Sequence, residues 1–163
     1  MIKIAEFQKV SFTQFSLDLP KGCNTASYEN IRIPKRATAG SAGYDIISPV
    51  DFCLEAGQSI RIPTGLRCRM EPGWMLLVMP KSGLGTRFRL QLDNTIGLID
   101  SDYYNAKNEG HIMVSLTNDS KSGHSLVLGA GKAFVQAVFV PYGITLDDEA
   151  EGEREGGFGS TGV

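Results

Sequence analysis

Two acidic residues separated by one position, Asp100 and Asp102, end an apolar stretch and precede Tyr103 in the segment NTIGLIDSDYY, residues 94–104. On an extended strand they would point to the same face, where two close carboxylates repel each other unless a cation or a donor lies between them. Such a pair can cap a hairpin as an Asx turn. It can also supply a general base that activates water, with the second acid in a structural or electrostatic role.

A second segment whose residues could bind a ligand is PKSGLG, residues 80–85, where an apolar run ends in Lys81, Ser82 and Gly83. Glycines let backbone N–H groups approach an anion closely, a lysine supplies charge and a serine supplies a hydroxyl donor. The segment lacks the P-loop pattern, and it equally fits a turn at the end of a strand.

Two further segments carry polar residues at the ends or in the middle of expected strands. ATAGSAGYDI, residues 37–46, places Asp45 at the start of a strand and by itself is a turn before that strand. GKAFVQAVFVPY, residues 131–142, places Gln136 inside an apolar strand. A buried amide must be hydrogen-bonded, so Gln136 is predicted to fix a neighbouring loop or to contact a ligand.

The segment REGGFGSTGV, residues 154–163, has four glycines around one aromatic residue, Phe158. Glycine loses more conformational freedom on ordering than any other residue. Phenylalanine, however, is scarce in segments that simply stay solvated. Something outside the segment is therefore expected to order it.

Alternation with a period of two dominates the elements that must position these residues. In residues 60–70 the apolar side chains fall on one face and the arginines on the other, which predicts strands with one solvent-exposed face. RFRLQL (87–92), HIMVSLTN (111–118) and FVQAVFV (134–140) are interpreted in the same way, whereas WMLLVMP (74–80) predicts a strand buried on both faces. No segment carries a long helical stripe, and residues 3–38 indicate only a short strand, IRI, at 31–33. Short strands separated by turns predict an antiparallel sandwich or barrel.

Length and composition limit the class of protein. The 163 residues suffice for one domain, 42% are hydrophobic, and no apolar run approaches the ~20 residues that span a bilayer. The first ten residues lack the pattern of a signal peptide, which predicts a cytoplasmic protein. The cysteines Cys23, Cys53 and Cys68 form no C-x-x-C pair and are predicted to be reduced and buried, without a disulfide framework or structural zinc.

Charge is distributed unevenly along the chain. The formal net charge is −2, but residues 147–163 hold six acidic residues and one arginine, a local −5 that leaves +3 for the rest. That balance is too weak for duplex nucleic acid. It is compatible with a local pocket for a small polyanion.

The segments AGYDI, PKSGLG, GLIDSDYY, GKAFVQ and REGGFGSTG, in this order, resemble the five motifs of the trimeric dUTPase family, the deoxyuridine triphosphate nucleotidohydrolases. The resemblance implies an all-β jelly-roll domain over residues 1–150 and a flexible, glycine-rich arm over residues 151–163 that closes the active site. It also implies a homotrimer with active sites between subunits. The implied reaction is the magnesium-dependent hydrolysis of dUTP to dUMP and pyrophosphate, which keeps uracil out of DNA and supplies dUMP for thymidylate synthesis.

The same resemblance implies roles for individual residues. Asp100 would be the general base, Asn94 and Gly97 would belong to the hairpin that binds the uracil edge, and Tyr103 would lie under the deoxyribose. The phosphates would be bound by Lys81, Ser82, Gly83 and Gln136. From the arm, Phe158 would stack on uracil, while Arg154, Ser160 and Thr161 would bind the terminal phosphates. Gly159 would also belong to the substrate-binding residues. Magnesium would be held mainly by phosphate oxygens and waters, with Asp45 in indirect support.

The sequence departs from the family pattern at several positions. Ala133 and Lys81 stand where many members carry arginine, the spacing from Arg154 to Phe158 is shorter by one residue, and the link after Tyr103, YNAKNEGHI, is longer. Two alternatives remain: a dCTP deaminase of the same fold, or a non-catalytic nucleotide-binding or regulatory protein. A Ser-His-Asp hydrolase is disfavoured, because the only histidines are His111 and His124 and no nucleophile elbow is present.

Overall fold

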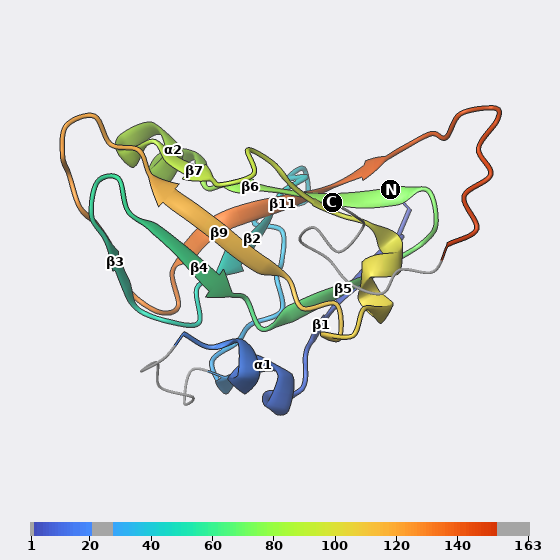
Figure 1. Ribbon diagram of the computed structural model, residues 1–163, viewed down its shortest axis with the longest axis horizontal. Coiled ribbons are helices and arrows are strands. Elements are labelled where there is room, and N and C mark those ends of the chain that lie inside the picture. The colour runs from blue at the N-terminus through green and yellow to red at the C-terminus, as the bar shows by residue number, and fades with distance from the viewer. Residues whose placement is uncertain (1, 21–27, 153–163) are drawn as a thin grey trace.

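The computed structural model describes residues 2–20 and 28–152, and β-strands are its main regular elements. In chain order the elements are β1 (Ala5–Lys9), α1 (Phe12–Asp18), β2 (Tyr44–Ile47), β3 (Phe52–Leu54), β4 (Ser59–Pro63), β5 (Leu66–Met70), β6 (Trp74–Pro80), α2 (Ser82–Phe88), β7 (Leu90–Leu92), β8 (Gly97–Ile99), the 3₁₀ helix η2 (Ser101–Asn105), β9 (Met113–Asn118), β10 (Leu126–Leu128) and β11 (Ala133–Pro141). Figure 1 shows their arrangement.

Antiparallel sheets form the two layers of the domain. One sheet has the order β2-β11-β6-β8 and another the order β4-β9-β7, while β1 pairs with β5 and β10 with β3. In the view of Figure 1, the strands β4 and β9 run diagonally and cross the direction of β11. Fully buried Leu76 and Phe134 from the first sheet and Leu116 from the second belong to one hydrophobic core. The fold is a jelly roll, which confirms the predicted all-β class.

The predicted alternation holds where one face of a strand meets the core. Ile62, Leu66 and Cys68 are buried, whereas Arg61 and Arg69 are exposed. The residues of β9 show the same alternation over most of their length. Period two therefore located the strands that cover the core on one side only.

The prediction for β6 was wrong in one respect. Leu76 and Val78 are buried, but Met75, Leu77 and Met79 are only half-buried. The continuous apolar run arises because the outer face of this strand is also apolar and no element of the described chain covers it fully. Apolar composition on two faces therefore did not mean burial on two faces within one chain.

Three local predictions were also wrong. Phe88 ends α2 and is not part of a strand, because Leu84 and Phe88 lie four residues apart on one side of that short helix, and the strand begins only at Leu90. Residues 31–33 form no strand. Cys53 is exposed, since its strand β3 turns Phe52 and Leu54 inward, whereas Cys68 is buried as predicted. Burial raises the pKa of the Cys68 thiol to about 12.

The N-terminal elements had no clear sequence signal. β1 pairs with β5 so that Phe7 lies opposite Cys68, and α1 inserts the fully buried ring of Phe15 into the core. The Ser11 hydroxyl accepts the N–H of Gln14 and so caps α1. Seven residues are too few for a helical stripe to be recognised. In the described part of the chain, no helix is long and apolar enough to cross a membrane.

Candidate active site

A cavity of about 380 Å³ opens beside the hairpin that joins β7 and β8. The apolar side chains Val78 and Val114 belong to its wall, and so do three residues predicted to bind substrate, Asn94, Gly97 and Tyr103. A mostly apolar wall with a few polar groups and a volume of roughly 300–1,000 Å³ is typical of small-molecule sites. The structure therefore brings these three predicted residues together.

The hairpin turn has a tightly constrained backbone. Thr95 has a φ of 69°, its N–H donates to the carbonyl of Leu92 over 2.9 Å, and the N–H of Ile96 donates to the carbonyl of Asn94 over 2.8 Å. A Cβ added at Gly97 would lie 3.1 Å from the Cβ of Val78. Gly97 thus lets β8 lie close against β6, and a larger residue there would push the hairpin away.

Tyr103 is held firmly in the wall of the cavity. Its side chain is only 3% exposed. Its hydroxyl donates to the carbonyl of His111 over 3.0 Å and accepts the Nδ2–H of Asn108 over 2.8 Å. The ring is therefore held in a fixed position in the wall of the cavity.

Asp100 lies directly between β8 and η2. It is the residue before the first turn of the 3₁₀ helix, its backbone is extended, and its carbonyl accepts the N–H of Tyr103 over 3.2 Å. Its side chain makes no capping hydrogen bond to η2, so it does not form the capping contact of an Asx turn. Because the strand ends at Ile99, Asp100 and Asp102 do not occupy one strand face. Asp100 is half-buried, whereas Asp102 is exposed.

A second group of predicted residues gathers where β6 ends. Lys81 Nζ lies 2.5 Å from Asp45 Oδ2, and Asp45 is the register partner of Gln136 on β11. Ser82 and Gly83 open α2, where the first backbone N–H groups precede the hydrogen bonds of the helix itself. A Cβ at Gly83 would meet nothing within 4 Å, so its backbone faces open space.

Gln136 differs from its prediction in burial. It is half-buried and lies on the outer face of the sheet, opposite Met79. A Cβ added at Gly43 would lie 3.3 Å from Gln136 Oε1, so the glycine leaves room for the amide. No residue of this second group belongs to the cavity wall as the described residues define it. The predicted site residues Arg154, Phe158, Gly159, Ser160 and Thr161 lie outside the described residues.

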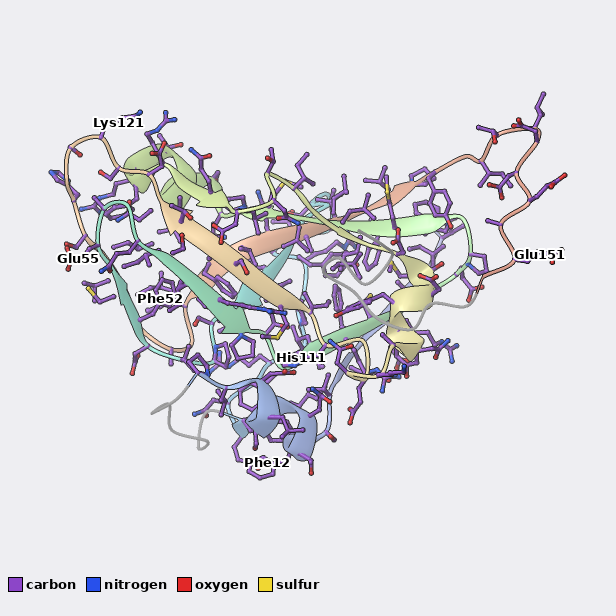
Figure 2. All side chains as sticks on the ribbon, in the orientation of Figure 1. Phe12, Phe52, Glu55, His111, Lys121 and Glu151 are labelled. Carbon is purple, nitrogen blue, oxygen red and sulfur yellow. The ribbon has the colours of Figure 1, made fainter. Side chains whose placement is uncertain are left out.

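Sequence reasoning missed the buried histidine behind this site. His111 is fully buried, its Nδ1 lies 2.6 Å from Asp18 Oδ2, and its Nε2 accepts the N–H of Gly65 over 2.9 Å. The proton therefore sits on Nδ1 and is donated to Asp18. Figure 2 shows His111 above α1, near the ends of β4 and β5. In the sequence, only the apolar neighbour Ile112 indicated that His111 is buried, and no pattern indicated its contact with Asp18.

Burial lowers the pKa of His111 below its ordinary value of 6.5, against the opposing hydrogen bond and charge of Asp18. The folded protein thus keeps His111 neutral, while the unfolded chain takes up a proton below pH 6.5. We expect the free energy of unfolding to fall as the pH is lowered from 7.5 to 5.5. His111 should contribute at most about 1.4 kcal/mol per pH unit to this fall. Urea unfolding at fixed protein concentration would measure it. His111→Gln should weaken this dependence and the exposed-site control His124→Gln should keep it; equal curves for both variants would contradict the assignment.

By its fold and site, the protein belongs to the class of all-β jelly rolls with a small-molecule cavity beside one hairpin. Comparison with known proteins identifies its family. The family model for dUTPase matches residues 29–162. The deoxyuridine 5'-triphosphate nucleotidohydrolase of Lactococcus lactis subsp. lactis is 41% identical over 141 residues, 83% of this chain and 93% of the relative. The enzyme of the same name from Burkholderia ambifaria is 41% identical over 139 residues, 80% of this chain and 88% of the relative. The chain belongs to the dUTPase family.

Solved structures agree with this assignment. The crystal structure of dUTPase from Streptococcus mutans has a TM-score of 0.66 at 33% identity and covers 85% of this chain and 97% of its own. A dUTPase mutant from phage phi11 of S. aureus, which is described with a structural Mg(II) ion, has a TM-score of 0.67 at 20% identity, over 92% of this chain and 98% of its own. At 20% identity, the similarity to the phage protein is a similarity of fold alone.

Proposed function

We propose that this protein is a dUTP diphosphatase, which hydrolyses the bond between the α and β phosphates of dUTP to give dUMP and pyrophosphate. The observation that carries the proposal is the hairpin cavity lined by Asn94, Gly97 and Tyr103, in a chain of the dUTPase family. Asp100 is not part of the cavity wall but follows Ile99, which is. Such an enzyme keeps uracil out of DNA and supplies dUMP for thymidylate synthesis. A cytoplasmic location fits an enzyme that acts on free nucleotides.

The cavity accounts for nucleoside binding. The uracil edge would bind to the backbone and amide of the hairpin at Asn94 and Gly97, where the glycine lets β8 lie close against Val78 of β6. The deoxyribose would lie on the ring of Tyr103. That ring is held by two hydrogen bonds, so it would stay in place and exclude a 2′-hydroxyl.

Asp100 would orient a water molecule and accept its proton as the water attacks the phosphoanhydride. Its half-buried place at the start of η2 fits a base that must reach both solvent and substrate. The leaving pyrophosphate would depart toward the group around Lys81.

The triphosphate would bind to Lys81, Ser82, Gly83 and Gln136. The open backbone at Gly83 and the charge of Lys81 suit an anion. The described residues contain no group of three or more acidic, histidine or cysteine side chains that could hold a metal ion. Magnesium would be held by phosphate oxygens and waters, with Asp45 accepting hydrogen bonds from those waters, and it would neutralise the triphosphate charge.

We further propose a homotrimer, which would unite the two groups of site residues across a subunit boundary. The sheet β2-β11-β6-β8 has an apolar outer face to which Met75, Leu77 and Val138 contribute half-buried side chains, and Leu98 is 50% exposed. Such a face is suited to a partner of the same chain. Residues 1–150 would form the jelly-roll domain, and residues 151–163 would be the arm that closes over a site.

The alternative that the protein is a dCTP deaminase is not favoured, because the relatives are named as deoxyuridine 5'-triphosphate nucleotidohydrolases. A non-catalytic protein would bind dUTP without consuming it.

Sugar selection gives the test of the proposed function. The protein should prefer dUTP over UTP by at least about 10² in kcat/KM, because a 2′-hydroxyl pressed against Tyr103 has neither space nor a hydrogen-bond partner. Pyrophosphate release should be measured with dUTP, UTP, dTTP and dCTP, together with ammonia release from dCTP. Equal kcat/KM values for dUTP and UTP would remove the role of Tyr103. Ammonia from dCTP without pyrophosphate from dUTP would contradict the proposed function.

A further inference from the structure

The hydroxyl of Tyr103 is bound on both sides by the loop that follows it, residues 104–111. Asn108 donates its Nδ2–H to the hydroxyl over 2.8 Å, and the hydroxyl donates to the carbonyl of His111 over 3.0 Å. The hydroxyl thus accepts one hydrogen bond and donates another. Asn108 is the single side chain in these two contacts, so the position of the ring depends on where the loop places it.

The backbone of the loop folds back tightly on Tyr103. Glu109 and Gly110 have φ values of 59° and 66°. A Cβ added at Gly110 would lie 2.6 Å from the carbonyl oxygen of Tyr103 and 2.7 Å from the Cα of Tyr104. Only glycine allows this approach, which brings Asn108 over the phenol.

The loop is also anchored to the N-terminal segment at its far end. The carboxylate of Glu109 accepts the backbone N–H of Ser11 over 2.7 Å and the Ser11 hydroxyl over 2.6 Å. These bonds lower the pKa of Glu109, so the carboxylate stays charged and the contact is charge-assisted. His111 is bound to Asp18 at the end of α1.

The start of the loop has its own anchor. The hydroxyl of Tyr104 donates to Gln8 Oε1 over 2.7 Å. The guanidinium of Arg67 lies 3.6 Å from the centre of the Tyr104 ring and donates to the carbonyl of Tyr104 over 2.7 Å. The loop is therefore held at both ends by residues 8–18 and by β5. Residues 8–18 precede the part of the chain that the family model matches.

We propose that Asn108 is a positioning residue for sugar selection, and that the N-terminal segment serves to hold its loop in place. This inference rests on the proposed function, because it acts through the contact of Tyr103 with the deoxyribose. Without the Asn108 bond, the ring can tilt away from the cavity and admit a 2′-hydroxyl. The dUTP/UTP ratio of kcat/KM should fall mainly because UTP is accepted better.

The test compares four variants with the unaltered protein. Asn108→Ala removes the donor, Tyr103→Phe removes the acceptor but keeps the ring, and the double variant removes both. Asn105→Ala is the matched control, since Asn105 is an exposed asparagine of the same segment. The value of kcat/KM is measured for dUTP and for UTP with each protein.

Asn108→Ala should lower the dUTP/UTP ratio by about tenfold, the usual effect of one lost hydrogen bond. Tyr103→Phe also removes the bond to His111 and should lower the ratio by at least as much. The double variant should lose no more than Tyr103→Phe, because the Asn108 bond is already absent once the hydroxyl is gone. Asn105→Ala should leave the ratio unchanged. Tyr103→Phe alone still tests the bond if Asn108→Ala does not fold.

Three outcomes would overturn the inference: an unchanged ratio in Tyr103→Phe or in a folded Asn108→Ala, additive losses in the double variant, or an equal loss in Asn105→Ala. In each of these cases dUTP hydrolysis by the unaltered protein leaves the proposed function standing. Absence of dUTP hydrolysis by the unaltered protein would instead contradict the proposed function, and the inference with it.

Discussion

Asp100→Asn should lower kcat by about 10²–10⁴-fold, the usual cost of losing a general base, while the fold and the binding of dUTP persist. Asparagine has nearly the same shape as aspartate, and the Asp100 side chain makes no capping hydrogen bond to η2 that the amide would lose. An amide cannot accept the proton of the attacking water. Steady-state kinetics would measure kcat, and binding of a non-hydrolysable dUTP analogue would measure affinity.

The matched control for this variant is Asp102→Asn, which removes an exposed carboxylate two residues further along, within η2. Its kcat should change far less than that of Asp100→Asn. Near-normal turnover in Asp100→Asn would eliminate Asp100 as the base. Equal losses in both variants would show that local charge matters and not one proton acceptor.

Deletion of residues 154–163 should abolish most of the activity and leave the jelly roll intact. All strands of the described chain end before residue 142, so thermal stability and trimer formation should change little. Catalysis should fall by on the order of 10² or more, because the proposed arm excludes water and positions the triphosphate. Phe158→Ala should have an intermediate effect, with the loss of a base-stacking contact worth roughly 1–3 kcal/mol.

Mixed trimers would show whether the arm serves a neighbouring subunit. Tail-deleted chains and Asp100→Asn chains are each expected to be poorly active. When their subunits exchange, some sites combine an intact Asp100 with an intact arm, and pyrophosphate release from dUTP should recover in part. No recovery in demonstrated mixed trimers would place the arm over its own subunit, and a fully active tail-deleted enzyme would remove the arm from the mechanism.

The sequence predicted the strands best where one face meets the core. Alternation around Ile62 and Cys68 is decided by burial within a single chain, so period two is a direct signal there. α1 and α2 span seven residues each, too few to show a stripe. The outer face of β6 was misjudged because an apolar strand does not indicate whether its own chain or another molecule covers it.

The sequence predicted residues of the cavity wall, but it did not predict the residues that hold them in place. Asn94, Gly97 and Tyr103 meet at one cavity, as ordered motifs indicated. The contacts that fix Tyr103 depend on Ser11 and Asp18, which lie 98 and 93 residues from their partners Glu109 and His111. No local pattern relates residues so far apart, since their contact exists only in the folded chain. The residues of this cavity wall were therefore easier to predict than the residues that hold them in place.

Product analysis with dUTP as the only nucleotide tests the central claim most directly. The protein is incubated with dUTP and magnesium, and dUMP, dUDP, pyrophosphate and inorganic phosphate are quantified over time. A dUTP diphosphatase should release dUMP and pyrophosphate in equal amounts, with no dUDP at any stage. Unchanged dUTP, or dUDP formed together with inorganic phosphate, would contradict the account.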